Sequence, residues 1–257
     1  MVTRDTAWPD GTPCWVDLGV DDIAQASAFY AGLFGWDIQP GPAEAGGYTM
    51  CLLAGRPVAG IGPKQGPPGA PPVWTTYLAA GNADETAAKI TKAGGHLFMD
   101  PFDVMDAGRM AVAADPGGAV FGIWQAGAHT GVGRANEPGT LCWNENHTRD
   151  FDRNKAFYQA VFGYDLGDIE GATRYATLKL GGREVGGILG LDPSGPAEVP
   201  AHWETYFALA DTDAAVAAVH AAGGSVIREP WDTPYGRMAI LADDQGAEFS
   251  AITQPGS

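Results

Sequence analysis

The sequence predicts an α+β fold made of four βαβββ modules arranged as two tandem domains. Two observations carry this prediction. An internal repeat runs along nearly the whole chain, and each half contains two successions of one strand, one helix and three further strands. A doubly wound dinucleotide-binding fold is not expected, because no glycine fingerprint follows a strand and opens a helix.

The repeat appears when the sequence is shifted against itself by about 128 residues. It aligns Trp15 with Trp143, Phe29-Tyr30 with Phe157-Tyr158, Gly108-Arg109-Met110-Ala111 with Gly236-Arg237-Met238-Ala239, and Asp115 with Asp243. The polar stretch between the copies has no apolar periodicity and is typical of a linker. We therefore predict an N-terminal extension (1–11), a first domain (12–126), a linker (127–138), a second domain (139–253) and a tail (254–257).

The first module begins with a strand over 12–20, where apolar and polar residues alternate. Asp21 or Asp22 is placed to cap the helix that follows, and Gly35 is placed to end it. An apolar stripe at helical spacing lies between them. Gly and Pro then bound three short strands, over 36–40, 47–54 and 57–62.

The second module follows a Pro-rich stretch and repeats this order. Its predicted elements are a strand over 73–80, a helix over 82–93 that Gly94-Gly95 closes, and strands near 96–102, 108–114 and 119–125. The second half of the chain repeats both modules.

Composition excludes several classes of partner. The chain has 31 acidic and 15 basic residues, and its net charge of −16 would repel nucleic acid and anionic lipid. No apolar run approaches the roughly 20 residues of a membrane helix, and no secretion signal is recognisable. Cys14, Cys51 and Cys142 lack the spacing of a zinc site. We expect a cytoplasmic protein, monomer or homodimer, that binds a small molecule and needs no cofactor.

Several phrases resemble a known family. They are Val20-Asp21-Asp22-Ile23, Phe29-Tyr30, Leu33-Phe34-Gly35-Trp36 and Asp115-Pro116-Gly117-Gly118. Together they are similar to the glyoxalase, bleomycin-resistance and extradiol-dioxygenase family, the vicinal-oxygen-chelate superfamily. The resemblance covers residues 11–253 and implies glyoxalase-like domains shaped as cupped, incomplete barrels. More narrowly, the chain resembles tandem-domain actinobacterial proteins labelled hydroxylases, a group to which a mycobacterial antigen belongs.

The resemblance also implies where a divalent metal would bind. The ligand positions of the superfamily fall on Trp15, Thr75 and Gly122 in the first copy and on Trp143, Glu204 and Ser250 in the second. Because tryptophan and glycine offer no metal ligand, we predict that the usual metal site is absent. An unusual site made of Glu145, His147, Glu204 and Glu248 is the less favoured alternative.

Strand alternation predicts which side chains line the two cups. The first cup receives the aromatic residues Trp15, Tyr77 and Trp124 together with Asp17, and the second receives Trp143, Glu145, His147, Glu204, Tyr206 and Glu248. Asp17, Glu145, His147 and Glu204 are the candidate catalytic residues, since carboxylates gathered in a partly apolar cavity become acid/base groups. The aromatic residues are the candidate substrate-binding residues.

The remaining assignments are left open. The tryptophans could simply pack the interior, and His147 and His202 could lie on the surface. Tyr48 and Tyr175 recur where a pocket wall would lie, which could equally report a need of folding. Arg109 and Arg237 are candidate substrate-binding residues, although an Arg at such a turn can instead pair with a carboxylate. We expect that partner to be Asp17 or Glu145.

These observations favour an enzyme of detoxification or secondary metabolism that acts on an aromatic or dicarbonyl-like compound without the usual metal. Proton transfer by Glu145 would be its central step. The resemblance leaves open a hydroxylase or a lyase or isomerase. The alternative is a protein that binds and sequesters a drug or metabolite without turnover.

Overall fold

A computed structural model describes residues 1–66, 69–169, 174–192 and 199–255. It confirms the predicted α+β class, with four α-helices and two eight-stranded sheets in this part of the chain. The predicted C-terminal tail is described only at residues 254 and 255; its last two residues lie outside the described part. Within the described residues, no helix is long and apolar enough to cross a membrane.

The first half folds into two βαβββ modules, as predicted. The first module contains β2 (Pro13–Val20), α1 (Ile23–Phe34), β3 (Asp37–Pro40), the short 3₁₀ helix η1 (Ala43–Ala45), β4 (Thr49–Leu53) and β5 (Arg56–Pro63). The second contains β6 (Val73–Ala79), α2 (Ala83–Lys92), β7 (His96–Val104), β8 (Gly108–Ala114) and β9 (Val120–Ala126).

The second half repeats this order. Its first module contains β11 (Leu141–Thr148), α3 (Phe151–Phe162), β12 (Asp165–Ile169), β13 (Tyr175–Leu180) and β14 (Arg183–Gly190). Its second contains β15 (His202–Ala208), α4 (Thr212–Ala221), β16 (Ser225–Thr233), β17 (Gly236–Ala242) and β18 (Glu248–Thr253). Outside these modules, β1 (Val2–Thr3) pairs with β10 (Arg134–Ala135), so the N-terminal extension contacts the predicted linker.

The predicted ends of α1 are confirmed, and each has a local cause. The Asp22 side chain accepts a hydrogen bond from the Gln25 amide at 2.9 Å, which satisfies one of the free N–H groups of the first turn. Gly35 ends the helix in the left-handed conformation, with φ 71°. Gly163 ends α3 in the same way, with φ 72°, as the repeat requires.

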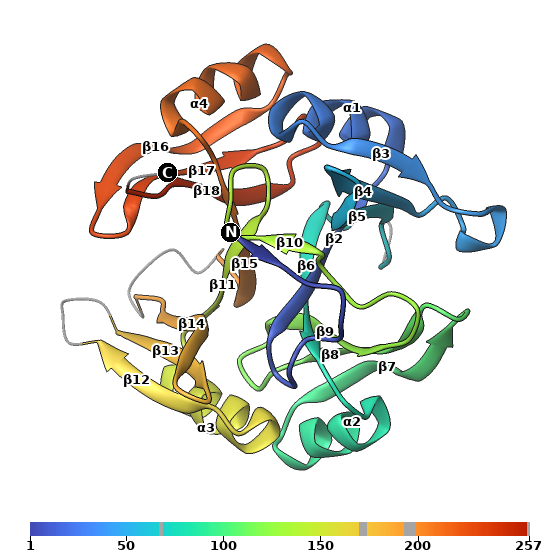
Figure 1. Ribbon diagram of the computed structural model, residues 1–257. Coiled ribbons are helices and arrows are strands. Elements are labelled where there is room, and N and C mark those ends of the chain that lie inside the picture. Colours follow the sequence, from blue (N-terminus) through green and yellow to red (C-terminus); the bar gives the residue numbers. More distant parts are fainter. Residues whose placement is uncertain (67–68, 170–173, 193–198, 256–257) are drawn as a thin grey trace.

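Each half forms one curved, open sheet (Figure 1). In the first sheet, the antiparallel pair β2 and β6 is central, and β5 and β9 join it on either side as parallel neighbours. The wings of the sheet are β3-β4-β5 and β9-β8-β7. The second sheet repeats this arrangement around β11 and β15. Neither sheet closes into a barrel.

The hydrophobic core joins the two halves. One cluster packs α1, through Phe29 and Phe34, against Phe207 and Phe249 of the second half. A second cluster packs α2 and β9 against α3 (Figure 1). Apolar side chains from both halves are therefore buried in shared clusters. We infer that the helices of each half are covered in part by the other half.

Buried hydrogen bonds reinforce this junction. Tyr158 of α3 donates to Asp115 of the first half at 2.8 Å, and Tyr30 of α1 donates to Asp243 of the second half at 3.1 Å. Asp115 and Asp243 occupy the same position of the repeat, at the start of the turn before the last strand of each half. Burial raises the pKa of both carboxyls, and the hydrogen bonds they accept from hydroxyl and amide groups oppose that rise.

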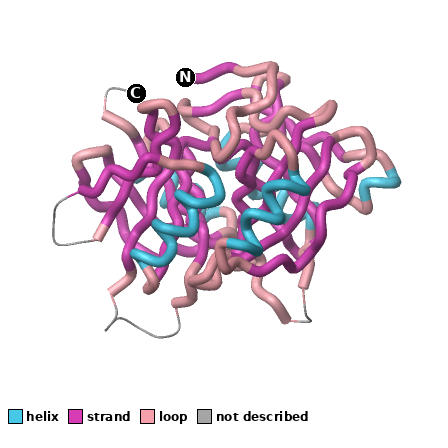
Figure 2. Tube along the Cα trace, turned by 90° about the horizontal axis from the view of Figure 1, so that it is seen from below, coloured by secondary structure: helices cyan, strands magenta, loops and turns pink. Residues whose placement is uncertain are grey.

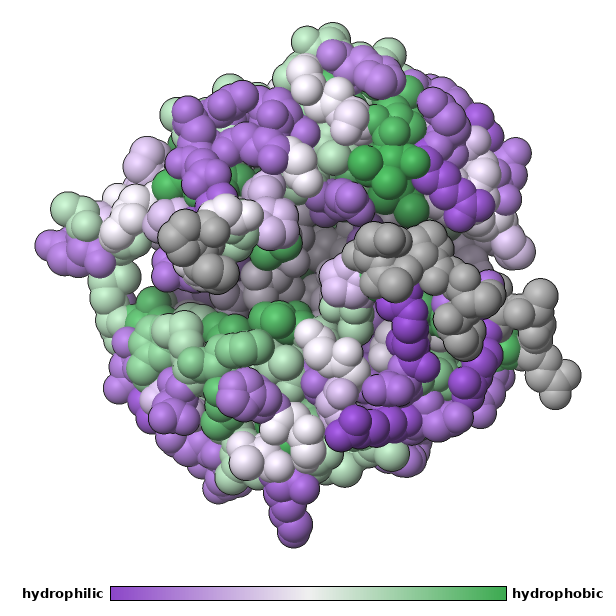
Figure 3. Space-filling model, turned by 180° about the vertical axis from the view of Figure 1, so that it is seen from behind, coloured by the Kyte–Doolittle hydropathy of each residue, from purple (hydrophilic) through white to green (hydrophobic). Residues whose placement is uncertain are grey.

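The two central strand pairs lie back to back. Asn144 of β11 donates to the Thr76 hydroxyl of β6 at 2.8 Å. Because successive side chains on a strand point to opposite faces, the neighbours of these residues point away from the junction, into the concave face of each sheet. Figure 2 shows both chain ends on one side of the molecule, and Figure 3 shows a hollow in the opposite face between hydrophobic and hydrophilic patches.

Candidate functional site

The concave faces of the two sheets are built on the same frame. We call cup one the concave face of the first sheet, lined by Trp15, Asp17, Tyr48, Tyr77 and Trp124. Cup two is the concave face of the second sheet, lined by Trp143, Glu145, His147, Tyr175, Glu204 and Tyr206. The predicted inward direction of these side chains agrees with their hydrogen bonds to one another.

In cup one a single carboxylate is held by two phenols. Tyr77 donates to Asp17 Oδ2 at 3.0 Å, and Tyr48 donates to the same atom at 3.4 Å. The indole N–H of Trp15 in turn donates to the Tyr48 hydroxyl at 2.9 Å. Burial raises the pKa of Asp17 to about 7, although both phenols act to lower it. Asp17 is therefore partly protonated near neutral pH.

In cup two the matching carboxylate has more partners. Tyr175 and Tyr206 each donate to Glu145 at 2.6 Å, and the indole N–H of Trp143 donates at 3.2 Å. His147 Nε2 lies 3.2 Å from the other side of the carboxylate, at Oε2. Predicted residues from three strands, β11, β13 and β15, therefore meet at one group.

Asp17 and Glu145 differ in charge at neutral pH because only Glu145 has a histidine, His147, beside it. Burial alone would raise the pKa of Glu145, but the hydrogen bond and charge of His147, together with the two phenols, outweigh it and lower the pKa. The repeat places Gly19 in cup one where His147 stands in cup two. Glu145 is therefore ionised at neutral pH, and its side chain keeps 12% of its surface exposed.

Cup two holds a second polar group beside Glu145. Glu204 faces Glu145 across the β11–β15 pair, accepts a hydrogen bond from Ser250 at 2.7 Å, and lies 3.5 Å from His202 Nε2. Burial alone would lower the pKa of His202, but Glu204 raises it overall. The rings of His147 and His202 are 4.7 Å apart. Two histidine–carboxylate pairs therefore stand side by side.

His202 and Ser250 were missed as parts of the site. His202 is two residues before Glu204 on the same strand, so alternation alone would have placed both on one face. Ser250 was considered only as a metal position. Glu248, expected in cup two, has a pKa raised by burial and by the charge of Glu204, which places it near this group.

The donor set does not fit the metal of the superfamily. At its ligand positions, cup two offers only the Glu204 carboxylate, next to Ser250 and Trp143, and cup one offers Trp15, Thr75 and Gly122. In the described ranges, no group of three or more His, Cys, Asp or Glu side chains has a geometry that could hold a metal ion.

Two glycines make room for the phenols that hold the carboxylates. A Cβ on Gly187 would lie 2.1 Å from the Tyr175 hydroxyl, and one on Gly60 would lie 1.8 Å from the Tyr48 hydroxyl. The recurrence of Tyr48 and Tyr175 therefore has a site-related cause, because each ring crosses the neighbouring strand only where the side chain is absent.

The expected pairing of Arg109 and Arg237 with the cup carboxylates is wrong. Arg109 donates to Asp84 of α2 and to Asp103, both within 3.0 Å, and Arg237 donates likewise to Asp213 of α4 and to Asp232. Both arginines share a strand face with the alanines that pack under the helices, which is the face opposite the cup. Neither guanidinium lies among the cup residues.

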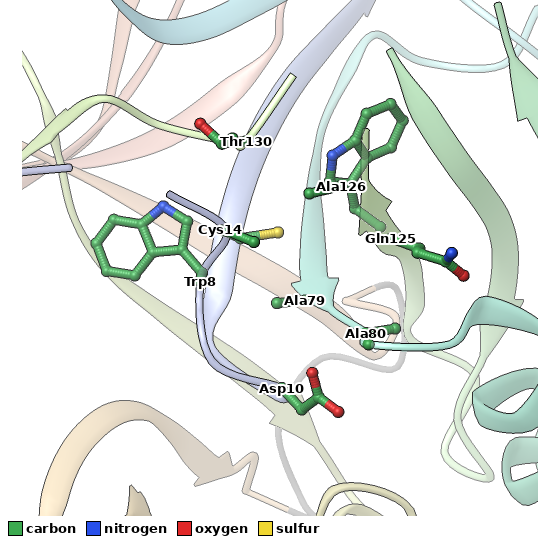
Figure 4. A pocket seen from close by; sticks show the side chains of 11 residues that line it. Trp8, Asp10, Cys14, Ala79, Ala80, Gln125, Ala126 and Thr130 are labelled. Carbon is green, nitrogen blue, oxygen red and sulfur yellow. The ribbon is translucent and has the colours of Figure 1, made fainter. Parts of the chain in front are cut away.

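Cup one buries its first-strand tryptophan more completely than cup two does. Trp15, Tyr77 and Trp124 are each buried, with at most 7% of their surface exposed, whereas Trp143 is only half-buried. The position of Trp124 is taken by Ile252 in the second copy. Trp124 also lines a pocket of about 200 Å³ beside cup one; in Figure 4 the Cys14 sulfur lies between Trp8 and Gln125 there.

Comparisons with known proteins find relatives over nearly the whole chain. "Putative glyoxylase CFP32" of Mycobacterium tuberculosis is 46% identical over 258 residues, which cover 97% of each chain. "Anthracycline biosynthesis protein DnrV" of Streptomyces peucetius is 38% identical over 266 residues, covering 96% of this chain and 94% of the relative.

Solved structures share the fold at low identity. The Mn(II)-bound glyoxalase from Novosphingobium aromaticivorans has a TM-score of 0.63 at 15% identity, covering 94% of this chain and 83% of that one. A variant of homoprotocatechuate 2,3-dioxygenase from B. fuscum has a TM-score of 0.65 at 14% identity, covering 98% and 74%. The family profile matches residues 14–123 and 147–250. The chain belongs to the glyoxalase/bleomycin resistance protein/dioxygenase superfamily.

Proposed function

We propose that cup two binds a small aromatic molecule and that the Glu145–His147 pair exchanges a proton with it. The observation that carries this proposal is the 3.2 Å contact between His147 Nε2 and the ionised Glu145, in a half-open cup. The matching carboxyl in cup one is partly protonated, and Gly19 stands where cup two has His147. The two copies share a frame, but only the second places a histidine against an ionised carboxylate, beside a half-buried tryptophan.

Glu145 and His147 have different roles in the proposed proton exchange. Glu145 already accepts hydrogen bonds from three other side chains, which makes it a weak base by itself. It can instead orient the imidazole and stabilise its protonated form, as a carboxylate does in many acid/base pairs. Within the described residues, Nδ1 of His147 has no hydrogen-bond partner. We therefore assign the moving proton to Nδ1 of His147.

Two features support an aromatic ligand. Trp143, Tyr175 and Tyr206 surround Glu145, and indole and phenol rings favour planar, hydroxylated partners. The Streptomyces relatives are named for anthracycline biosynthesis, and anthracyclines contain a planar, hydroxylated ring system. Both features support the proposed role in secondary metabolism, acting on a compound of this class.

The test compares binding with turnover in the same variants. Quenching of tryptophan fluorescence by a panel of hydroxyanthraquinones, anthracyclines and dicarbonyl compounds identifies a ligand, and mass spectrometry detects its product. His147→Asn and Glu145→Gln should keep affinity within about threefold and lose roughly 100-fold or more in turnover. Asp17→Asn in cup one is the matched control and should leave turnover intact. Unchanged turnover in both cup-two variants would refute the mechanism.

A second candidate function is binding without turnover. It is favoured by the aromatic frame, which is kept in both copies although only one has the histidine–carboxylate pairs. In that case a ligand would quench the tryptophan fluorescence of the wild-type protein, but no product would form. Trp143→Phe would then weaken binding more than Glu145→Gln does.

A further inference from the structure

Cup one contains a ring that the chain itself supplies. The imidazole of His129 lies edge-on to the indole of Trp15, with centroids 4.3 Å apart and planes at 82°. The indole of Trp124 is 5.6 Å away on another side. These are the separations and angles of favourable aromatic pairs. His129 therefore fills the aromatic space above Trp15.

The backbone around this histidine is well held. Trp124 donates from its indole N–H to the His129 carbonyl at 2.9 Å, and the His129 amide donates to the Ala107 carbonyl at 3.0 Å. Gly127 also donates to Ala107, and Val132 donates to the Cys14 carbonyl at 2.8 Å. Residues 127–132, which we call the strap, are thus fastened to the β7–β8 turn and to β2.

The ring itself is less well satisfied than its backbone. Nε2 of His129 is buried and has no hydrogen-bond partner. Burial lowers the pKa of His129 to about 4, so the ring is neutral at physiological pH. Buried polar atoms in proteins are nearly always paired. The aromatic contacts alone account for the position of this ring.

Cup two shows no such ring in the part of the chain that the structure describes. Among the described residues, no aromatic side chain contacts Trp143 face or edge, and Ile252 replaces Trp124. Within the described residues, the two cups therefore differ in whether an aromatic ring packs on the first-strand tryptophan.

We propose that the His129 ring is an internal ligand of cup one and keeps a small, neutral, planar nitrogen heterocycle from binding there. Trp15 and Trp124 provide the aromatic walls. The Asp17 carboxyl, with the phenols that donate to it, provides the polar end of the cup. An external ring of this class enters only when the His129 side chain leaves. This site is separate from cup two and does not depend on the function proposed for it.

The test removes the internal ring and offers an external one. His129→Gly leaves the strap backbone able to form its hydrogen bonds and empties the space above Trp15. Free imidazole at pH 8, where it is mostly neutral, should then bind saturably with a millimolar Kd, quench tryptophan fluorescence and raise the Tm of the variant by several degrees. Acetamide, which is polar but not aromatic, should do neither.

The matched controls are the wild-type protein and His96→Gly, which removes an exposed histidine of β7. Neither should respond saturably to imidazole. A His129→Gly variant whose Tm and fluorescence are indifferent to imidazole would overturn the proposal, as would an equal response in the controls. If His129→Gly does not fold, the same titration of His129→Ala and nuclear Overhauser contacts between the His129 and Trp15 rings in the wild type decide. Absence of those contacts would also overturn it.

Discussion

Asp17→Asn should stabilise the protein at alkaline pH and leave its stability nearly unchanged in acid. The folded-state pKa of Asp17 is raised from 3.8 to about 7, so the folded protein binds a proton that the unfolded chain releases. Stability from this group is fully present below pH 3.8 and is lost as the pH rises through 7. Each pKa unit corresponds to about 1.4 kcal/mol, so the loss approaches about 4 kcal/mol.

Asparagine cannot ionise and can still accept the hydrogen bonds of Tyr48 and Tyr77. Since Asp17 is only half-buried by surface area, we expect a gain of about 2–4 kcal/mol at pH 8 and little change at pH 4. Urea unfolding of wild type and variant between pH 4 and 8 measures the difference directly. A stability difference that does not grow with pH would refute the argument that Asp17 is protonated by burial.

Glu145→Gln is the matched control in the other cup, and its sign is opposite. The folded-state pKa of Glu145 is lowered, so this carboxylate adds stability above its unfolded pKa of 4.5 and loses it in acid. The variant should therefore be destabilised at pH 8 and less so at pH 4. Parallel curves for the two variants would mean that the cups do not differ in charge.

Two further substitutions test the junction and the frame. Tyr158→Phe removes the 2.8 Å hydrogen bond to Asp115 of the first half and leaves the buried indole N–H of Trp203 without its acceptor, and should lower the free energy of unfolding by about 1–3 kcal/mol in urea titrations; no loss would mean that the Tyr158–Asp115 bond does not stabilise the junction. Gly187→Ala places a Cβ against the Tyr175 hydroxyl and should move it off Glu145, raising the pKa of that carboxyl in ¹³C NMR titrations; an unchanged titration would contradict this geometry.

The modules could be predicted because their signals are local. The Asp22 cap, the Gly35 stop and the alternation along β2 and β11 each depend on residues close in the chain, and the repeat gave every signal twice. The same alternation placed Glu145 and Tyr206 on one face. Their meeting could be predicted because both lie on strands that pair directly.

The partners of Arg109 and the place of His129 could not be predicted in this way. Arg109 pairs with Asp84 across 25 residues, through a helix whose docking on the sheet no local pattern specifies. His129 enters cup one from a segment that resembles a linker in composition, because its hydrogen bonds are made by backbone groups and leave no trace in side-chain type. The shared core of the two halves also depends on contacts between distant segments.

The central claim is that two copies of one frame have diverged, leaving cup two as the open site for an aromatic ligand. Isothermal titration of wild type, Trp143→Phe and Trp15→Phe with the anthracycline or hydroxyanthraquinone that quenches most strongly tests this claim directly. We predict one ligand bound per chain, weakened at least tenfold by Trp143→Phe and unaffected by Trp15→Phe. Binding that is lost with Trp15→Phe, or the absence of binding by every compound of the panel, would contradict the claim.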